Sequence, residues 1–443
     1  MRSQIINYRF SPVVIALTCM LAGGALAQQE TTADNEGKSS PTNTDKTEES
    51  ADGAVPSEAQ QRELGADEDP LATKQAQRQA ERTDEKPVTQ ERTTGFDIYG
   101  SARVRYRDQG GDNAWQDGGS RAGASIDWQF KQGSYLFARY EAGFSVLSGI
   151  GDFLPGENPE EEFEDSVFTR LRHVGLDAPG FTALIGKNWS TYYQVASFTD
   201  RFMGAGGSAS GAFNAQTDGG PTGPGRADYA VQAKLSTEFL PHTQFKPFDL
   251  NIQVQQGNTI PFGGGAEYEQ SFGVSAVLTT QKDFTVGLAY NHANIDLDKD
   301  PSLRSVGISE DARAALIGTR AFGDRWYAGL VFARLENHET TDEGIYFDGW
   351  GSELYGQYHL FDRVWLIGGY NILEPDSDQT QAGGYRIRYA VAGLRYTFDD
   401  FRRMIFANIR IDDSLDADGT AGGNVYTIGI RWDLSNRGWH ISD

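Results

Sequence analysis

Few side chains in this sequence could carry out acid–base or metal chemistry, and they are scattered. None of the six histidines falls in a metal-binding spacing such as His-x-x-x-His, and no Gly-x-Ser-x-Gly nucleophile motif occurs. The single cysteine, Cys19, lies in an N-terminal stretch that we expect to be removed. We therefore expect no catalytic residue, no cofactor and no metal site, and do not expect an enzyme.

Arginines with a regular spacing are more informative. From Phe96 to Arg107, apolar and polar residues alternate, so that Arg103 and Arg105 share one face with Tyr99. This alternation is typical of a β-strand with one apolar and one wet side. Because arginine keeps its charge even when several are crowded, such a face can order ions and dipolar solutes electrostatically.

The stretch from Phe181 to Arg226 is unlike the rest of the chain. It opens as a strand and then shows neither the two-residue period of a strand nor the period of a helix. It is rich in Gly, Ala and Ser, and between the strand and Arg226 its only charges are Asp200, Arg201 and Asp218. A loop of this length is functional or disordered, and its aromatic content argues against disorder. We predict that it folds back into the hole of a β-barrel and narrows it. Its aromatic residues include Trp189, Tyr192, Tyr193 and Phe198.

The N-terminus predicts export. Basic Arg2 and Arg9 precede an apolar stretch, and Ala25-Leu26-Ala27 stands directly before Gln28. This pattern predicts a signal peptide over residues 1–27, cleaved near Ala27-Gln28. Since no other segment has the length of a membrane-spanning helix, the chain can cross a membrane only as a closed barrel.

Residues 28–94 form a segment of different composition. It has no aromatic residue, and sixteen acids against eight bases. Such a segment cannot bury enough apolar surface to fold, so we expect an acidic, disordered periplasmic spacer. A coiled-coil tether is the alternative, although Leu64 and Leu71 alone do not make a heptad seam.

Residues 95–434 predict an all-β fold, a transmembrane antiparallel barrel of about sixteen strands. Two-residue alternation recurs along this region, and the breaks between strands alternate between short and long. Short turns at one end and long loops at the other are typical of transmembrane barrels, whereas a soluble sandwich has no reason to sort them. We expect the nine residues 435–443 to extend beyond the barrel.

The last strand and two internal motifs carry a family resemblance. Thr427, Gly429, Trp432 and Leu434 resemble the C-terminal signal that the assembly machinery of outer-membrane barrels reads. With IYGSARVRY from Ile98 and FTRLRHVGLDAPGFTALIGKNWSTYY from Phe168, the barrel resembles the general diffusion porins of Gram-negative outer membranes. The resemblance implies a trimer of sixteen-stranded channels, surrounded by lipid and lipopolysaccharide, whose third long loop enters the pore.

The resemblance also implies a pore constriction. Arg121, Arg170 and Arg226 match the arginine positions of the family's basic wall. Ser101 stands where the family often has lysine, and Arg103 and Arg105 could replace that charge. Arg139 and Arg172 also alternate inward by spacing. In the family, acids of the third loop face this basic wall. Asp200 is the best match for them in this sequence, and Asp218 is the second. The predicted basic wall is therefore Arg103, Arg105, Arg121, Arg139, Arg170, Arg172 and Arg226.

We therefore expect an outer-membrane channel for passive diffusion of small hydrophilic solutes. Two alternatives stay open: a substrate-selective porin whose Trp189, Tyr192, Tyr193 and Phe198 stack on a sugar or an organic acid, and a plugged structural or adhesin barrel. The resemblance implies that the loop with the acids of residues 157–165 reaches over a neighbouring subunit, where it could form a latch or bridge cations to lipopolysaccharide; a solvated acidic loop is the alternative. The part of the chain after residue 94 has a net charge of −17, which favours cations, whereas the arginines favour anions, so ion preference stays open. The net charge of −23 for the whole chain argues against nucleic-acid binding.

Overall fold

A computed structural model describes residues 94–147, 167–237, 248–280, 283–399 and 402–441. The expected signal peptide, the 28–94 segment except Thr94, and the acidic stretch 157–165 lie outside the described residues. None of the helices in the described part of the chain has the length and hydropathy needed to cross a membrane.

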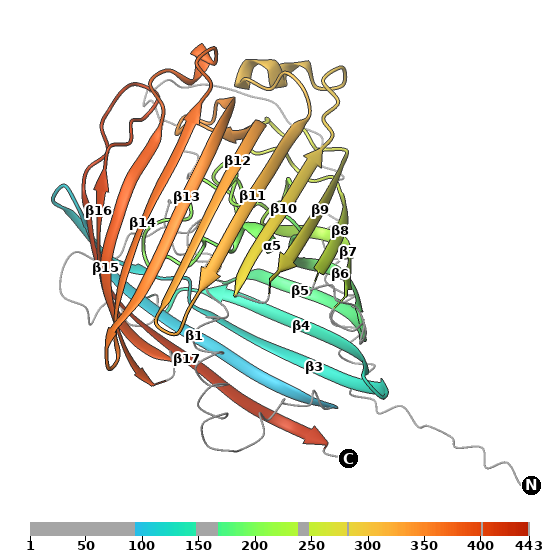
Figure 1. Cartoon of the computed structure of the whole chain (residues 1–443). Helices are drawn as coiled ribbons and strands as arrows, with labels where there is room; N and C mark the ends of the chain where they lie inside the picture. Colours follow the sequence, from blue (N-terminus) through green and yellow to red (C-terminus); the bar gives the residue numbers. More distant parts are fainter. Residues whose placement is uncertain (1–93, 148–166, 238–247, 281–282, 400–401, 442–443) are drawn as a thin grey trace, which may run out of the picture. The chain divides into compact units, whose positions relative to one another are not determined.

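The described residues form a single antiparallel sheet with three short helical turns (Figure 1). Its elements are β1 (Thr94–Gln109), β2 (Asp112–Asp117), β3 (Arg121–Lys131), β4 (Ser134–Phe144), β5 (Val167–Ala178), β6 (Phe181–Trp189), α5 (Tyr193–Ala196), β7 (Arg226–Ser236), β8 (Phe248–Gln256), β9 (Gln270–Thr279), β10 (Phe284–Ala293), η3 (Pro301–Val306), β11 (Ala312–Phe322), β12 (Trp326–Thr340), β13 (Tyr346–Phe361), β14 (Val364–Pro375), η4 (Thr380–Ala382), β15 (Ile387–Asp399), β16 (Arg403–Asp412) and β17 (Val425–Ile441).

The sheet closes on itself because β1 pairs with β17 on one edge and with β2 and β3 on the other. β2 and β3 are two parts of one barrel strand, interrupted where the Asp117 carboxylate accepts hydrogen bonds from the backbone N–H groups of Gly119 and Ser120 at 2.8 and 2.7 Å. The seventeen strands of the described residues therefore make sixteen barrel positions. This confirms the predicted fold class and strand number.

The two faces of the barrel wall differ in chemistry, as the alternation predicted. On β8, the Val254 side chain is 59% exposed while the adjacent Gln253 is 2% exposed. The same split holds on β10, where exposed Leu288 neighbours buried Ala289. An apolar exposed face is what transmembrane barrels present to lipid. We call these two surfaces the exposed face and the buried face of the wall.

Two segment boundaries differ from the sequence-based expectation. One of the long breaks between predicted strands covers Asp108 to Ser120. In the structure this stretch is mostly strand, since β1 continues to Gln109 and β2 follows after two residues. The last strand does not end at Leu434 but continues to Ile441, because its backbone pairs with β1 as far as Thr94. Residues 435–441 thus complete the closure of the barrel instead of extending beyond it.

Candidate functional site

The connection between β6 and β7, residues 190–225, is closed at its own base. The backbone N–H of Ser190 donates to the carbonyl of Gly225 at 2.8 Å, and the Ser190 hydroxyl donates to the carbonyl of Pro224. The same hydroxyl accepts a hydrogen bond from the N–H of Tyr193 at 2.9 Å, which starts α5. We call residues 190–225 the β6–β7 segment.

A buried glutamate on β13 holds the middle of the β6–β7 segment. Oε1 of Glu353 accepts hydrogen bonds from the backbone N–H groups of Ala209 and Ser210 at 2.7 and 2.8 Å. Its Oε2 accepts one from the Thr199 hydroxyl at 2.6 Å. Gly351, two residues earlier, allows the carbonyl of Ala209 to come within 1.9 Å of where a Cβ would stand. The segment therefore lies directly on the backbone of this strand.

Neutral amides on β7 and β8 hold the end of the same segment. Nε2 of Gln253 donates to the carbonyl of Gly223 at 2.9 Å, and Nε2 of Gln255 donates to the carbonyl of Gly220 at 2.7 Å. Oε1 of Gln253 also accepts from the N–H of Thr191 at 3.2 Å and from Nε2 of Gln232 at 2.9 Å. These amides therefore bind backbone groups at both ends of the β6–β7 segment.

The aromatic residues predicted to stack on a solute pack inside the protein instead. Tyr192, Tyr193 and Phe198 are buried in a cluster with apolar residues of β10 to β14. The Tyr193 ring stacks on Trp189 with centroids 4.1 Å apart, and the Tyr192 hydroxyl donates to the carbonyl of Ser210 at 2.7 Å. The buried rings of Tyr192, Tyr193 and Phe198 thus serve packing in this conformation, and Trp189 lies half-buried against them.

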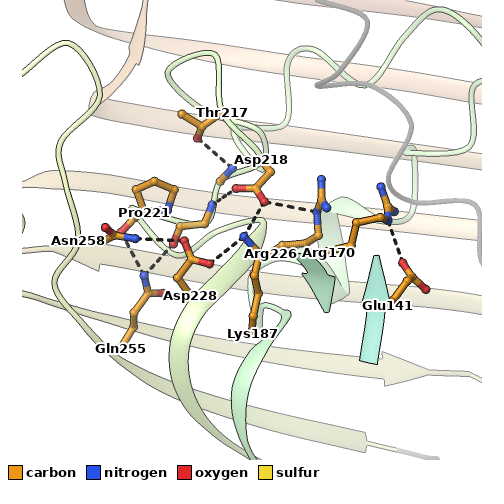
Figure 2. A network of polar contacts seen from close by, with 12 residues as sticks. Glu141, Arg170, Lys187, Thr217, Asp218, Pro221, Arg226, Asp228, Gln255 and Asn258 are labelled. Atoms are coloured by element: carbon orange, nitrogen blue, oxygen red, sulfur yellow. Dashed lines mark hydrogen bonds and ion pairs between the residues drawn. The ribbon is translucent and has the colours of Figure 1, made fainter. Parts of the chain in front are cut away.

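Arg170 and Arg226 are the two buried cations that Figure 2 shows side by side; they are 1% and 2% exposed. Nε of Arg170 donates to Oε1 of Glu141 at 2.8 Å, and Glu141 also pairs with Arg139 at 3.1 Å. Arg121 lies close enough that its charge acts on both buried guanidinium groups. Four of the predicted arginines therefore gather in one place.

Beside these arginines, Lys187 joins two carboxylates. Its Nζ lies 3.0 Å from Oδ2 of Asp218 and 2.8 Å from Oδ1 of Asp228 (Figure 2). The same Asp218 oxygen is 3.6 Å from Nε of Arg226. Burial acts to raise the pKa of the Asp218 carboxyl, but the charges of Arg226 and Lys187 outweigh it, so that this pKa lies below its ordinary value.

The other predicted residues lie as follows. Asp200, the preferred loop acid, is buried and accepts a hydrogen bond from the Tyr193 hydroxyl at 2.7 Å. Nε of Arg103 donates to the Ser101 hydroxyl at 2.8 Å, and Nε of Arg105 to Oε1 of Gln116 at 3.2 Å. Asp218, the second choice, pairs with Arg226 of the predicted wall.

Arg172 is not brought to the cluster. It stands opposite Tyr140 on β4, whose ring is exposed, and next to the exposed Val174. The pairing of β4 with β5 shifts at Arg170, which is an extra residue between Thr169 and Leu171. A β-bulge of this kind breaks the alternation. Arg170 and Arg172 therefore lie on different faces, and the inward prediction for Arg172 is wrong.

Sequence reasoning missed Glu141, Lys187 and Asp228. Glu141 could have been found, because it shares the parity of Arg139 on β4. Lys187 could not, because the pairing of β6 with β7 shifts between Gly186 and Asn188. Regular alternation would put Lys187 on the exposed face of the wall, together with Ile185.

The residues of the assembly signal divide between the two faces of β17. Thr427 is buried, whereas Trp432 and Leu434 are exposed, and Gly429 is packed against the ring of Phe406. No group of three metal-binding side chains occurs in the part of the chain that the structure describes.

Neither a protein-family model nor a curated protein matches this chain, but solved structures match its fold. OmpF of Salmonella typhi, in complex with daunomycin, has a TM-score of 0.62 and 18% identity, covering 77% of this chain and 98% of that one. The anion-selective porin from Comamonas acidovorans has a TM-score of 0.54 and 14% identity, covering 77% and 100%. The outer membrane channel DcaP of Acinetobacter baumannii has a TM-score of 0.55 and 10% identity, covering 77% and 98%. The chain therefore has the fold of the general diffusion porins, a closed antiparallel barrel of sixteen strands.

Proposed function

We propose that this chain is an outer-membrane porin, a water-filled channel through which small hydrophilic solutes and ions diffuse passively. The observation that carries the proposal is the combination of an apolar exposed face with a charged buried face in a closed barrel. An apolar outer surface suits lipid, and polar groups inside suit water. The resemblance of the fold to porins supports the same function.

In this proposal the buried face lines the lumen and the β6–β7 segment narrows it. The contacts of Glu353 and Gln253 with the segment support that position, because both side chains belong to the buried face. The constriction is formed by Arg103, Arg105, Arg121, Arg139, Arg170 and Arg226 on the wall, with Asp218 at the end of the segment and Asp200 further along it. A transverse field between such groups orients dipolar solutes.

The wider setting belongs to the same proposal. A cleaved signal peptide directs the chain to the periplasm, the assembly machinery and chaperones insert it through the signal in β17, and residues 28–93 act as a periplasmic spacer. The protein is a homotrimer in the lipid and lipopolysaccharide of a Gram-negative outer membrane and is not an enzyme.

Single-channel recording of the purified, folded mature protein in planar bilayers tests the proposal. We expect large, steady conductance steps that close in threes. Swelling of vesicles in sugars of increasing size separates general diffusion from selective transport. Absence of conductance from a demonstrably folded barrel would contradict the porin function.

A plugged structural or adhesin barrel is the second candidate. The low exposure of Arg170 and Arg226 favours it, because a wide, open constriction would leave these side chains wet. The same recording decides between the two, since a plugged barrel gives no steady current.

A further inference from the structure

Asp218 of the β6–β7 segment contacts a lysine as well as an arginine. Lys187 lies between Asp218 and Asp228, and the side chains of all three are largely but not fully buried. Nδ2 of Asn258 donates to the other oxygen of Asp228 at 3.1 Å, and the N–H of Gly220 to Oδ1 of Asp218 at 2.9 Å. Both carboxylates are thus held in place around one ammonium group (Figure 2).

The charged groups that are linked around Lys187 and Arg170 include more cations than carboxylates. The cations are Arg121, Arg139, Arg170, Lys187 and Arg226, and the carboxylates are Glu141, Asp218 and Asp228. Within this set, five positive groups stand against three negative ones. Lys187 supplies one of them, although it belongs to no arginine position of the wall.

We propose that the channel prefers anions, and that Lys187 sets this preference by neutralising Asp218. The inference rests on the proposed channel function and adds the solute class, namely small carboxylate- or phosphate-bearing anions and halide ions. With Asp218 compensated, the guanidinium groups of Arg170 and Arg226 determine the sign of the field that a permeating ion meets. At about 4 Å, one unit charge changes the local concentration of an ion severalfold even in water.

A purely mechanical role for Lys187 predicts something different. If Lys187 only latched the end of the β6–β7 segment, its removal would change the conductance but not the preference between ions. If its charge matters, removing one nearby carboxylate as well should restore the preference, although the latch is still broken. The charge-balanced double variant therefore separates the two roles.

The test is the reversal potential under a potassium chloride gradient, from which the chloride-to-potassium permeability ratio follows. We expect a ratio above one for the wild type. Lys187→Met should lower it by roughly twofold to fivefold, Lys187→Arg should keep it, and Lys187→Met with Asp228→Asn should return it toward the wild-type value. Asp228→Asn alone should raise it and provides an independent measurement if Lys187→Met fails to insert.

Lys234→Met is the matched control. Lys234 lies on β7, as Asp228 does, but pairs with Asp249 at 2.8 Å beside the β5–β6 turn. This variant should leave the ratio unchanged. A cation-preferring wild type, or a Lys187→Met channel with an unaltered ratio, overturns the inference while the porin function stands. A folded wild type without conductance overturns the porin function itself, and the inference with it.

Discussion

Two parts of the barrel wall use their buried faces in opposite ways. Along β8 to β14, neutral amides and the carboxylate of Glu353 bind the backbone of the β6–β7 segment. Along β3, β5 and β7, the corresponding positions carry Arg121, Arg170 and Arg226. We call these the supporting wall and the arginine wall. The contrast shows that one side of the barrel fixes the segment, and the other supplies the charge that the segment faces.

Removal of Glu353 should have the largest effect, because it releases the segment from the supporting wall. Glu353→Ala leaves the buried N–H groups of Ala209 and Ser210 without their acceptor, and removes one of two acceptors of the Thr199 hydroxyl. We expect the free energy of unfolding to fall by about 3 kcal/mol or more, and the conductance to rise. Urea unfolding followed by tryptophan fluorescence, with single-channel recording, measures both.

Glu353→Gln is the control for that prediction, since it keeps an oxygen that can accept from Ala209 and Ser210. It should lose much less stability than Glu353→Ala. Equal stability of the alanine variant and the wild type would show that the segment is held elsewhere.

The contact between Gly351 on β13 and the carbonyl of Ala209 gives a second way to displace the β6–β7 segment from the supporting wall. In Gly351→Ala, the new Cβ would lie 1.9 Å from the carbonyl oxygen of Ala209, so the segment must shift. We expect a loss of about 1–3 kcal/mol and noisier single-channel currents. Gly356→Ala on the same strand meets no atom closer than 3.8 Å and should behave as the wild type. Equal behaviour of the two variants would mean that the segment does not rest on Gly351.

The arginine wall is tested by two residues of one strand. Arg170→Ala removes a buried cation from the cluster, so we expect a larger conductance or a shifted ion preference. Arg172→Ala removes the same charge from the opposite face and should leave single-channel behaviour unchanged. Recording both variants in the same salt makes the comparison direct. If Arg170→Ala behaved as Arg172→Ala, Arg170 would not belong to the constriction.

These two arginines also show how far the sequence predicts the site. Regular alternation is enough to predict the strands, the faces and the closed barrel, because each strand must present one apolar side. It also predicts that Arg170 and Arg172 share a face. The extra residue in β5 reverses that relation, and nothing in the local sequence announces it.

A shift in strand pairing also explains why the positions of Lys187 and Asp228 were not predicted. Both stand where the pairing of β6 with β7 shifts, next to Gly186, whose φ of 130° favours glycine, and to Tyr229, whose φ is also positive. Bulges re-aim side chains, and they depend on both paired strands instead of on one sequence window. Glu141 differs, because β4 itself has no extra residue between Arg139 and Glu141, so its parity with Arg139 would have been sufficient to find it.

The smallest expected effect concerns the carboxyl of Asp218, which joins the β6–β7 segment to the arginine wall. Its pKa lies below the ordinary value, because Arg226 and Lys187 outweigh the effect of burial. A lowered pKa in the folded state means that the carboxylate stabilises the fold fully above the unfolded pKa of about 3.9, and that this contribution is lost as the pH falls through the lower folded value. We therefore expect the difference in unfolding free energy between wild type and Asp218→Asn, about 1 kcal/mol, to stay constant from about pH 7 to pH 5 and to shrink below about pH 4. Urea unfolding of both proteins at these pH values measures it. A difference that already shrinks between pH 7 and pH 5 would mean that Asp218 is not paired with Lys187 and Arg226, and that the segment and the arginine wall are not joined by charge.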